Sequence, residues 1–307
     1  MGVFHCPMEA AFYDDDGCID CGMCSAVTEQ EMVEASKKIR AYLRSHAASE
    51  GPVKKIAVCG KGGAGKSTIV ALIANALRSK GYSVLVIDTD ESNPGLYRLF
   101  GLDKEPKPLM TLLSRFPSRS RRKSDSKWLQ REQITIPDIP AQYLLNRDGL
   151  KLLTVGKIQD PFQGCACSIA DMTRDLMGKL VVGEKEIVLV DMEAGIESFG
   201  RGVERNVDTV LVIVEPSFES MTLAEKICYM AEGMGIVRVK AILNKVPSEK
   251  VEQKMIEELN KRSVKSLGTV YFDPQLNEAG FEGAPLGDSK ATGDIQTIIT
   301  LLLGEGR

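Results

Sequence analysis

Long apolar runs and an excess of positive charge are both missing from this 307-residue sequence. It contains no apolar stretch of about 18 residues and no positively charged start followed by an apolar region, so neither a membrane-spanning helix nor a secretory signal is expected. The formal net charge of −3 gives no general attraction to nucleic acid or anionic lipid. We interpret one basic run, residues 115–123, as a solvated loop. We therefore expect a cytoplasmic globular protein that binds neither membrane nor nucleic acid.

The sequence contains eight cysteines, and their interpretation depends on the expected compartment, because the cytosol keeps thiols reduced. Clustered cysteines there are more often metal ligands or redox groups than structural disulfides. Cys59 and Cys228 stand alone in apolar surroundings, and we predict that both lie in the core. The other six form two groups, namely Cys165 with Cys167, and Cys6 with Cys18, Cys21 and Cys24.

The sequence divides near residue 50. Residues 28–48 begin with Thr28 and Glu31 in capping-box spacing and continue with apolar residues at helical intervals, which predicts an amphipathic helix. Residues 49–55 include glycine and proline together, as in a linker. We therefore expect a cysteine-rich module with its helix over residues 1–48 and a larger domain over residues 53–305.

Beyond the linker, short β-branched runs alternate with helical patterns. Such nearly continuous apolar runs are typical of parallel strands that are buried on both faces. Strands are predicted over residues 55–59, 83–88, 186–191, 209–215, 239–244 and 267–272, and helices over 66–80, 222–233 and 248–263. This alternation predicts an α/β fold with a doubly wound, mainly parallel sheet. Residues 104–150 contain five prolines, and we interpret them as a partly helical insertion over the sheet edge or the active face.

The strongest local signal is GKGGAGKST at residues 60–68, which matches the P-loop pattern G-x-x-x-x-G-K-[ST]. In such a loop, backbone amides curl around phosphate oxygens, and the positive end of the following helix adds to the attraction. We expect Lys66 to neutralise the β and γ phosphates and the Ser67 hydroxyl to bind Mg²⁺. The candidate residues for binding ATP or ADP are Gly60, Lys61, Gly62, Gly63, Ala64, Gly65, Lys66, Ser67 and Thr68.

Lys61 follows Gly60 directly, and KGGAGKS is the deviant Walker A signature. It resembles the SIMIBI family of dimeric P-loop ATPases, which includes MinD-like, ParA-like, ArsA-like and nitrogenase iron protein members. The resemblance implies ATP hydrolysis by a homodimer in which Lys61 reaches the partner's nucleotide. It assigns further roles by position: Asp90 to the attacking water, Asp191 to Mg²⁺, Asn244 to adenine, Gly195 to the γ-phosphate, and residues 214–216 and 273–276 to the loops beside the base.

The pair in GCACS, Cys165 and Cys167, offers two thiolates, which cannot complete a tetrahedral metal shell alone. Together with DMEAGIE at 191–197 and GRG at 200–202, this segment resembles the ATPases of the CooC type that mature carbon monoxide dehydrogenase, over about residues 53–305. The resemblance implies a four-thiolate site for Ni²⁺ or Zn²⁺ between two subunits, with carbon monoxide dehydrogenase as client. The alternatives are a redox disulfide, an incidental pair and a persistent iron–sulfur cluster.

The amino-terminal cysteines are spaced Cys6-x11-Cys18-x2-Cys21-x2-Cys24, with Pro7 after the first. This pattern resembles half of a bacterial ferredoxin and favours a [4Fe-4S] cluster. A zinc site with four cysteine ligands is the main alternative, and His5 is a possible substitute ligand.

Three functions are consistent with these residues. The first is an ATP-dependent nickel metallochaperone for carbon monoxide dehydrogenase. The second is an ATP-gated iron–sulfur reductase similar to nitrogenase iron protein. The third is a MinD-like or ParA-like positioning ATPase, although the carboxyl-terminal segment lacks the basic face of a membrane-targeting helix.

Overall fold

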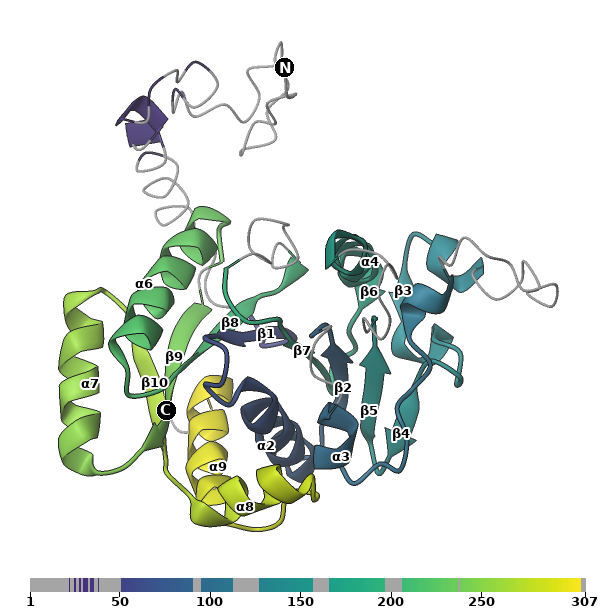
Figure 1. The fold of residues 1–307 in the computed structure, drawn as a ribbon. Coiled ribbons are helices and arrows are strands. Elements are labelled where there is room, and N and C mark those ends of the chain that lie inside the picture. The colour runs from purple at the N-terminus through teal and green to yellow at the C-terminus, as the bar shows by residue number, and fades with distance from the viewer. Residues whose placement is uncertain are drawn as a thin grey trace.

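The computed structural model describes residues 51–90, 95–112, 127–156, 166–196, 206–236 and 238–304, together with residues 22, 25, 28, 30–32, 34, 35 and 38. A central sheet of eight strands runs through the larger domain, with helices on both of its faces (Figure 1). This arrangement confirms the α/β fold with a doubly wound, mainly parallel sheet.

The strand order is β10-β9-β8-β1-β7-β2-β5-β4. Each neighbouring pair is parallel except β4 with β5, which is antiparallel. The strands are β1 (Lys55–Gly60), β2 (Ser83–Asp88), β4 (Leu145–Arg147), β5 (Leu150–Thr154), β7 (Glu186–Asp191), β8 (Thr209–Val214), β9 (Arg238–Val246) and β10 (Ser266–Tyr271). A separate parallel pair consists of β3 (Ile134–Thr135) and β6 (Leu180–Val181).

The helices cover the sheet in two layers (Figure 1). One layer holds α2 (Lys66–Ser79), α3 (Leu96–Leu99), α8 (Pro274–Glu282) and α9 (Lys290–Leu303). The other holds α4 (Ala166–Lys179), α6 (Phe218–Gly233) and α7 (Glu249–Lys261). Short 3₁₀ turns, η2 (Leu109–Leu112), η3 (Lys127–Gln130) and η4 (Ile136–Asp138), lie in the segment before β4.

The alternation of side chains along each strand builds two hydrophobic cores, one on each face of the sheet. In β1, Ile56 and Val58 pack against α2 and α9, whereas Ala57 and Cys59 pack toward α6. All four of these side chains are fully buried. Cys228 of α6 joins the same core as Cys59, so both isolated cysteines are buried core residues, as predicted.

Polar contacts hold the chain just before β1, in an arrangement that we call the β1 clamp (Gly51, Lys54, Lys55, Asp208 and Arg238). The Asp208 carboxylate accepts hydrogen bonds from the backbone N–H groups of Lys54 and Lys55 at 2.9 and 2.6 Å. Arg238, which is buried, donates to the Gly51 carbonyl at 2.6 Å. The clamp lies at the amino end of β1, opposite the end that carries the P-loop.

The predicted strands all occur, and the main differences concern helices and the insertion. α6 begins at Phe218, earlier than the expected residue 222, because the Ser217 hydroxyl caps it by accepting from the Ser220 N–H at 3.3 Å. The predicted partly helical insertion at 104–150 contains 3₁₀ turns, β3 and the edge strand β4, and no α-helix among its described residues. Prolines and short apolar runs there favour turns over a continuous helix.

The described residues of the amino-terminal segment confirm one prediction. The Thr28 N–H donates to the Glu31 carboxylate at 3.0 Å, and the Glu31 N–H donates to the Thr28 hydroxyl at 3.2 Å, which is the reciprocal capping box. Cys6, Cys18, Cys21 and Cys24 lie outside the described residues. In the part of the chain that the structure describes, none of the helices has the length and apolar character needed to cross a bilayer.

Candidate nucleotide-binding site

The P-loop connects the carboxyl end of β1 to the start of α2, between strands β7 and β8. Gly60 has φ +142°, and a Cβ there would lie 2.5 Å from the Ile213 carbonyl oxygen. Gly65 has φ +90°, and its Cβ would lie 2.5 Å from Nδ2 of Asn244. Both positions therefore need glycine, for backbone conformation and for space, which is the physical reason for the spacing seen in the sequence.

Lys66 starts α2 and lies inside the curve of the loop. Its side chain is buried, and Nζ lies 3.5 Å from the carbonyl oxygen of Lys61 on the opposite side of the loop. The loop closes further through the Ala64 N–H, which donates to the same carbonyl at 3.2 Å. An ammonium held at the positive end of a helix, beside glycine amides, is suited to bind a polyphosphate.

Three carboxylates gather beside this loop, at the carboxyl ends of β2 and β7. Asp88 and Asp191 are the last residues of these two strands and pair in register. The Asp90 N–H donates to Oδ1 of Asp88 at 3.1 Å, and the Thr89 hydroxyl donates to the Asp191 carbonyl at 2.7 Å. All four residues are buried, so three acidic groups are held away from bulk water at this end of the sheet.

Asp191 is the most perturbed member of this group. Complete burial, and then repulsion from Asp88, raise the pKa of Asp191 from 3.8 to about 7, although the Ser67 hydroxyl and the Lys66 ammonium act in the opposite direction. Among the described residues, neither carboxylate oxygen of Asp191 receives a hydrogen bond of good geometry. A buried carboxylate in this condition needs a positive partner.

A magnesium ion would satisfy that need. Mg²⁺ prefers hard oxygen ligands and is held in nucleotide sites by one or two protein groups together with phosphate oxygens. The unsatisfied oxygens of Asp191 and the hydroxyl of Ser67, on adjoining elements, form such a donor set. The residues present therefore fit the ion that the P-loop motif implies.

A cavity of about 380 Å³ opens beside the start of α2, opposite the carboxylates. Its wall includes Thr68, Asn244 and Asp273, together with Phe272 and Phe281. Nδ2 of Asn244 donates to the Ala64 carbonyl at 2.8 Å, so this side chain supports the P-loop from the cavity wall. The two aromatic rings are exposed and offer stacking surfaces of the kind that bind nucleobases. The cavity suits the base of a nucleotide whose phosphates lie in the P-loop.

Asp273, in the wall of this cavity, holds two helix starts together. Its carboxylate accepts from the Gln275 N–H at 3.0 Å and from the Ala291 N–H at 3.2 Å, which joins the starts of α8 and α9. Burial acts to raise its pKa, but these backbone hydrogen bonds outweigh burial and the net pKa is lowered. Segment 273–276 therefore forms part of the cavity wall, and the Asp273 carboxylate is used to accept backbone N–H groups at the starts of α8 and α9.

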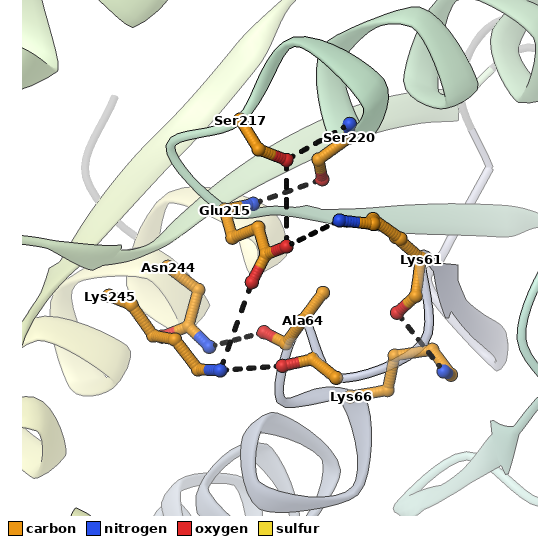
Figure 2. Close-up of polar contacts among 9 residues, drawn as sticks. Lys61, Ala64, Lys66, Glu215, Ser217, Ser220, Asn244 and Lys245 are labelled. Atoms are coloured by element: carbon orange, nitrogen blue, oxygen red, sulfur yellow. Dashed lines mark hydrogen bonds and ion pairs between the residues drawn. The ribbon is translucent and has the colours of Figure 1, made fainter.

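Lys61 points away from Lys66, toward the end of β8 (Figure 2). Its Nζ forms an ion pair with Oε1 of Glu215 at 3.1 Å. On the other side of Glu215, Lys245 has its Nζ 3.8 Å from Oε2 and donates to the Gly63 carbonyl at 2.5 Å. Glu215 was expected only as part of the loop 214–216 beside the base, and Lys245, which follows the predicted Asn244, was not expected in the site.

The remaining predicted residues are placed as follows. The Gly195 N–H donates to the Gly60 carbonyl at 3.3 Å, so the segment that follows β7 lies against the P-loop. Cys165 lies outside the described residues, and Cys167 lies in the first turn of α4, where only the backbone is described. Within the described ranges, no three His, Cys, Asp or Glu side chains, the three carboxylates beside the P-loop included, are arranged to hold a metal ion by themselves. The metal role of the cysteine pair therefore stays a prediction.

Comparison with known proteins gives three results. The family model described as CobQ/CobB/MinD/ParA nucleotide binding domain matches residues 55–286. An uncharacterized ATP-binding protein of Methanocaldococcus jannaschii is 38% identical over 253 residues, which cover 81% of this chain and 99% of that protein. The carbon monoxide dehydrogenase accessory protein CooC of Rhodospirillum rubrum is 33% identical over 233 residues, covering 75% and 88%.

Solved structures agree in fold. The MinD cell division protein of Aquifex aeolicus covers 83% of this chain and 98% of its own, with a TM-score of 0.57 and 22% identity. At that identity the likeness concerns the arrangement of the sheet and its helices.

Proposed function

This chain belongs to the CobQ/CobB/MinD/ParA nucleotide-binding family, and from that premise we propose that it is an ATP-hydrolysing accessory protein that delivers nickel to a carbon monoxide dehydrogenase. The observation that carries the proposal is the 33% identity over 233 residues to a protein named as a carbon monoxide dehydrogenase accessory protein. Nickel is the cargo in this proposal, and ATP is the substrate. Residues 53–305 are the proposed ATPase domain.

The nucleotide site supports each step of hydrolysis with residues of this chain. The proposed phosphate cradle is residues 60–68, in which the loop amides and Lys66 balance the charge of the β and γ phosphates. Ser67 and Asp191 would hold Mg²⁺, which supplies further charge neutralisation there. Asp90, fixed through its backbone to Asp88, is the proposed residue that orients the attacking water and accepts its proton. Asn244 on the cavity wall would contact the adenine.

The proposed cargo site is the pair Cys165 and Cys167, of which Cys167 lies in the first turn of α4. Two such pairs, one from each subunit of a homodimer, would supply four soft thiolate ligands, which suit Ni²⁺ or Zn²⁺. The positive end of a helix also favours negative charge near its first turn. Because α4 and the P-loop belong to one domain, ATP binding that tightens the dimer would rearrange the metal site, and hydrolysis or ADP release would relax it. Nucleotide state would then be coupled to metal state.

The amino-terminal cysteines Cys6, Cys18, Cys21 and Cys24 are proposed to hold a [4Fe-4S] cluster in a module that spans residues 1–48. Their spacing supports this assignment, with zinc as the competing occupant. The cluster and the nickel site can be tested separately, because iron and sulfide should depend on the amino-terminal cysteines and nickel should depend on Cys165 and Cys167.

The test is a nickel titration of anaerobically purified full-length protein, with and without Mg-ATP, followed by sedimentation. We expect about one nickel per two chains, bound in the dimer and lost in Cys165→Ser and in Cys167→Ser, which leave two thiolates where four are needed. Cys228→Ala is the matched control, since it removes a buried cysteine from a core and leaves nickel binding unchanged. Equal nickel binding in all variants would remove the cargo role from the pair.

Hydrolysis is measured in parallel as phosphate release with nickel and the client enzyme present. Release no faster than that of Lys66→Ala would contradict the proposed ATPase activity. Two other outcomes would replace the function. Iron and sulfide without nickel binding, with an ATP-dependent cluster potential, would favour the iron–sulfur reductase, and ATP-dependent sedimentation with vesicles or DNA would favour a positioning ATPase.

A further inference from the structure

Strand β9 is irregular where it passes the P-loop. Leu243 pairs with Thr269, but Val246 pairs with Tyr271, so β9 uses one residue more than β10 over this interval. Inside the interval, Lys245 has φ +58°, a left-handed conformation that non-glycine residues rarely adopt. Such register shifts re-aim side chains next to functional sites. The irregularity is therefore evidence for a role of Lys245 and not only for local packing.

The re-aimed side chain reaches the phosphate-binding loop. In a regular strand, Asn244 and Lys245 would point to opposite faces of the sheet. Here both donate to neighbouring carbonyls of the P-loop, Asn244 to Ala64 at 2.8 Å and Lys245 to Gly63 at 2.5 Å. The register shift thus adds a third lysine to a site that already contains Lys61 and Lys66.

Glu215 lies between two of these lysines (Figure 2). Its carboxylate forms a close ion pair with Lys61, 3.1 Å from Oε1, and a longer one with Lys245, 3.8 Å from Oε2. The Glu215 side chain is 20% exposed, whereas those of Lys61 and Lys245 are 37% and 45% exposed. Its backbone is fixed, because the Glu215 N–H donates to the Ser220 hydroxyl at the start of α6 at 3.1 Å. The carboxylate is therefore the least solvated and most fixed member of the group, and it benefits most from a cationic partner.

We propose that Glu215 is a positioning residue that keeps Lys61 within its own subunit, and that the longer ion pair with Lys245 shortens to take over the same carboxylate when Lys61 leaves. This inference rests on the ATP-linked dimer of the proposed function, and on the expectation from the deviant Walker A signature that Lys61 reaches the partner's nucleotide in that dimer. Exchange between two lysines keeps Glu215 paired in both states. Lys245 has three N–H donors, so it can approach Glu215 and retain its bond to the Gly63 carbonyl.

The exchange gives opposite signs for two substitutions. Glu215→Gln removes the charge that holds Lys61 but keeps the size of the side chain, so it frees Lys61 and favours dimer formation. Lys245→Met removes the replacement partner, so departure of Lys61 leaves the carboxylate with no cation and only the Ser217 hydroxyl, 3.5 Å from Oε1, and dimer formation becomes harder. In the double variant there is no carboxylate left to satisfy, so it should behave as Glu215→Gln alone. A simple loss of P-loop support would weaken dimer formation in all three variants.

The first measurement concerns Lys61 in the chain without nucleotide. The full-length protein is acetylated with a limiting amount of acetic anhydride, and labelling of Lys61 is measured by peptide mass spectrometry. We expect labelling to rise about two- to fivefold in Glu215→Gln, the range for loss of a partly exposed ion pair. The matched control is Glu225→Gln, which removes an ion pair of similar length, 3.0 Å to Arg262, away from the P-loop. Labelling of Lys61 that is equal in wild type and Glu215→Gln would overturn the proposal.

The second measurement is the ATP concentration at which half of the chain sediments as a dimer. We expect this concentration to fall at least twofold in Glu215→Gln and in the double variant, and to rise at least twofold in Lys245→Met. A rise in all three variants would overturn the exchange. If Lys61 labelling increases as expected but wild type and variants all stay monomeric at saturating ATP, the ion pair stands as a contact of the monomer, while the proposed dimer, and with it the exchange, is refuted.

Discussion

Asp191 makes the stability of the nucleotide-free protein depend on pH in an unusual direction. Its pKa is about 7 in the folded chain, against the ordinary value of 3.8. Between these two values the folded state binds more protons than the unfolded state, so the free energy of unfolding falls as pH rises. The ionised, buried carboxylate destabilises the fold by about 4 kcal/mol above pH 7, of which about 3 kcal/mol develops between pH 5 and pH 8.

Asp191→Asn removes this term, because the amide does not ionise. We expect the free energy of unfolding of the variant, relative to wild type, to increase by about 3 kcal/mol between pH 5 and pH 8 when Mg²⁺ and nucleotide are absent. Urea unfolding can follow the fluorescence of Trp128, which is buried and is the one tryptophan of the sequence. Asp148→Asn, at an exposed carboxylate, is the control and should show no such increase.

A second experiment distinguishes the role of Asp191 in binding Mg²⁺ from the effect of burying its carboxylate. Mg-ATP should stabilise wild type more at pH 8 than at pH 5, because the cation then compensates an ionised carboxylate, and it should stabilise Asp191→Asn little at either pH. A relative stability of Asp191→Asn that is the same at both pH values would refute the reasoning, since Asp191 would then ionise as easily in the folded chain as in water.

Three further predictions follow from single contacts. Gly65→Ala should weaken ATP binding, measured by calorimetry, at least tenfold. Residue 65 has φ +90°, which alanine rarely adopts, and the added Cβ would lie 2.5 Å from Nδ2 of Asn244. Unchanged affinity would show that the loop relaxes freely. Arg238→Met should lower the free energy of unfolding by about 3 kcal/mol while ATP affinity stays the same, since the β1 clamp is at the far end of the strand, and a loss of affinity would contradict that separation. The Cys228 thiol, whose pKa burial raises to about 12, should react with iodoacetamide at pH 8 only after unfolding, and rapid reaction in the folded chain would be evidence against its burial.

The fold and the phosphate-binding loop could be predicted from the sequence because both depend on local patterns. Continuous apolar runs predicted the strands, and the spacing of Gly60, Gly65 and Lys66 predicted the loop. The carboxylate cluster was predictable only as separate strand ends, because the register that pairs Asp88 with Asp191 joins segments about 100 residues apart. Periodicity alone carries no information on such pairing.

The ion pairs that Glu215 forms with Lys61 and Lys245 could not be predicted from the sequence for a related reason. The pairing of β9 with β10 must shift before Lys245 can point toward the P-loop, and nothing in the letters ILNK marks that shift. Likewise, β4 has three residues and pairs at the sheet edge through contacts with β5, too short a run to give a period. These features arise from tertiary pairing, which overrides local preference.

The β1 clamp determines where the chain can be shortened. Arg238 donates to the carbonyl of Gly51, and the N–H groups of Lys54 and Lys55 donate to Asp208, so the folded unit extends a few residues ahead of its first strand. A protein that starts at residue 50 keeps all of these hydrogen bonds, whereas one that starts at residue 53 loses the acceptor at Gly51. A chain that begins at residue 50 therefore keeps the contacts that fix β1, and the nucleotide-binding domain can be produced without the cysteine-rich segment.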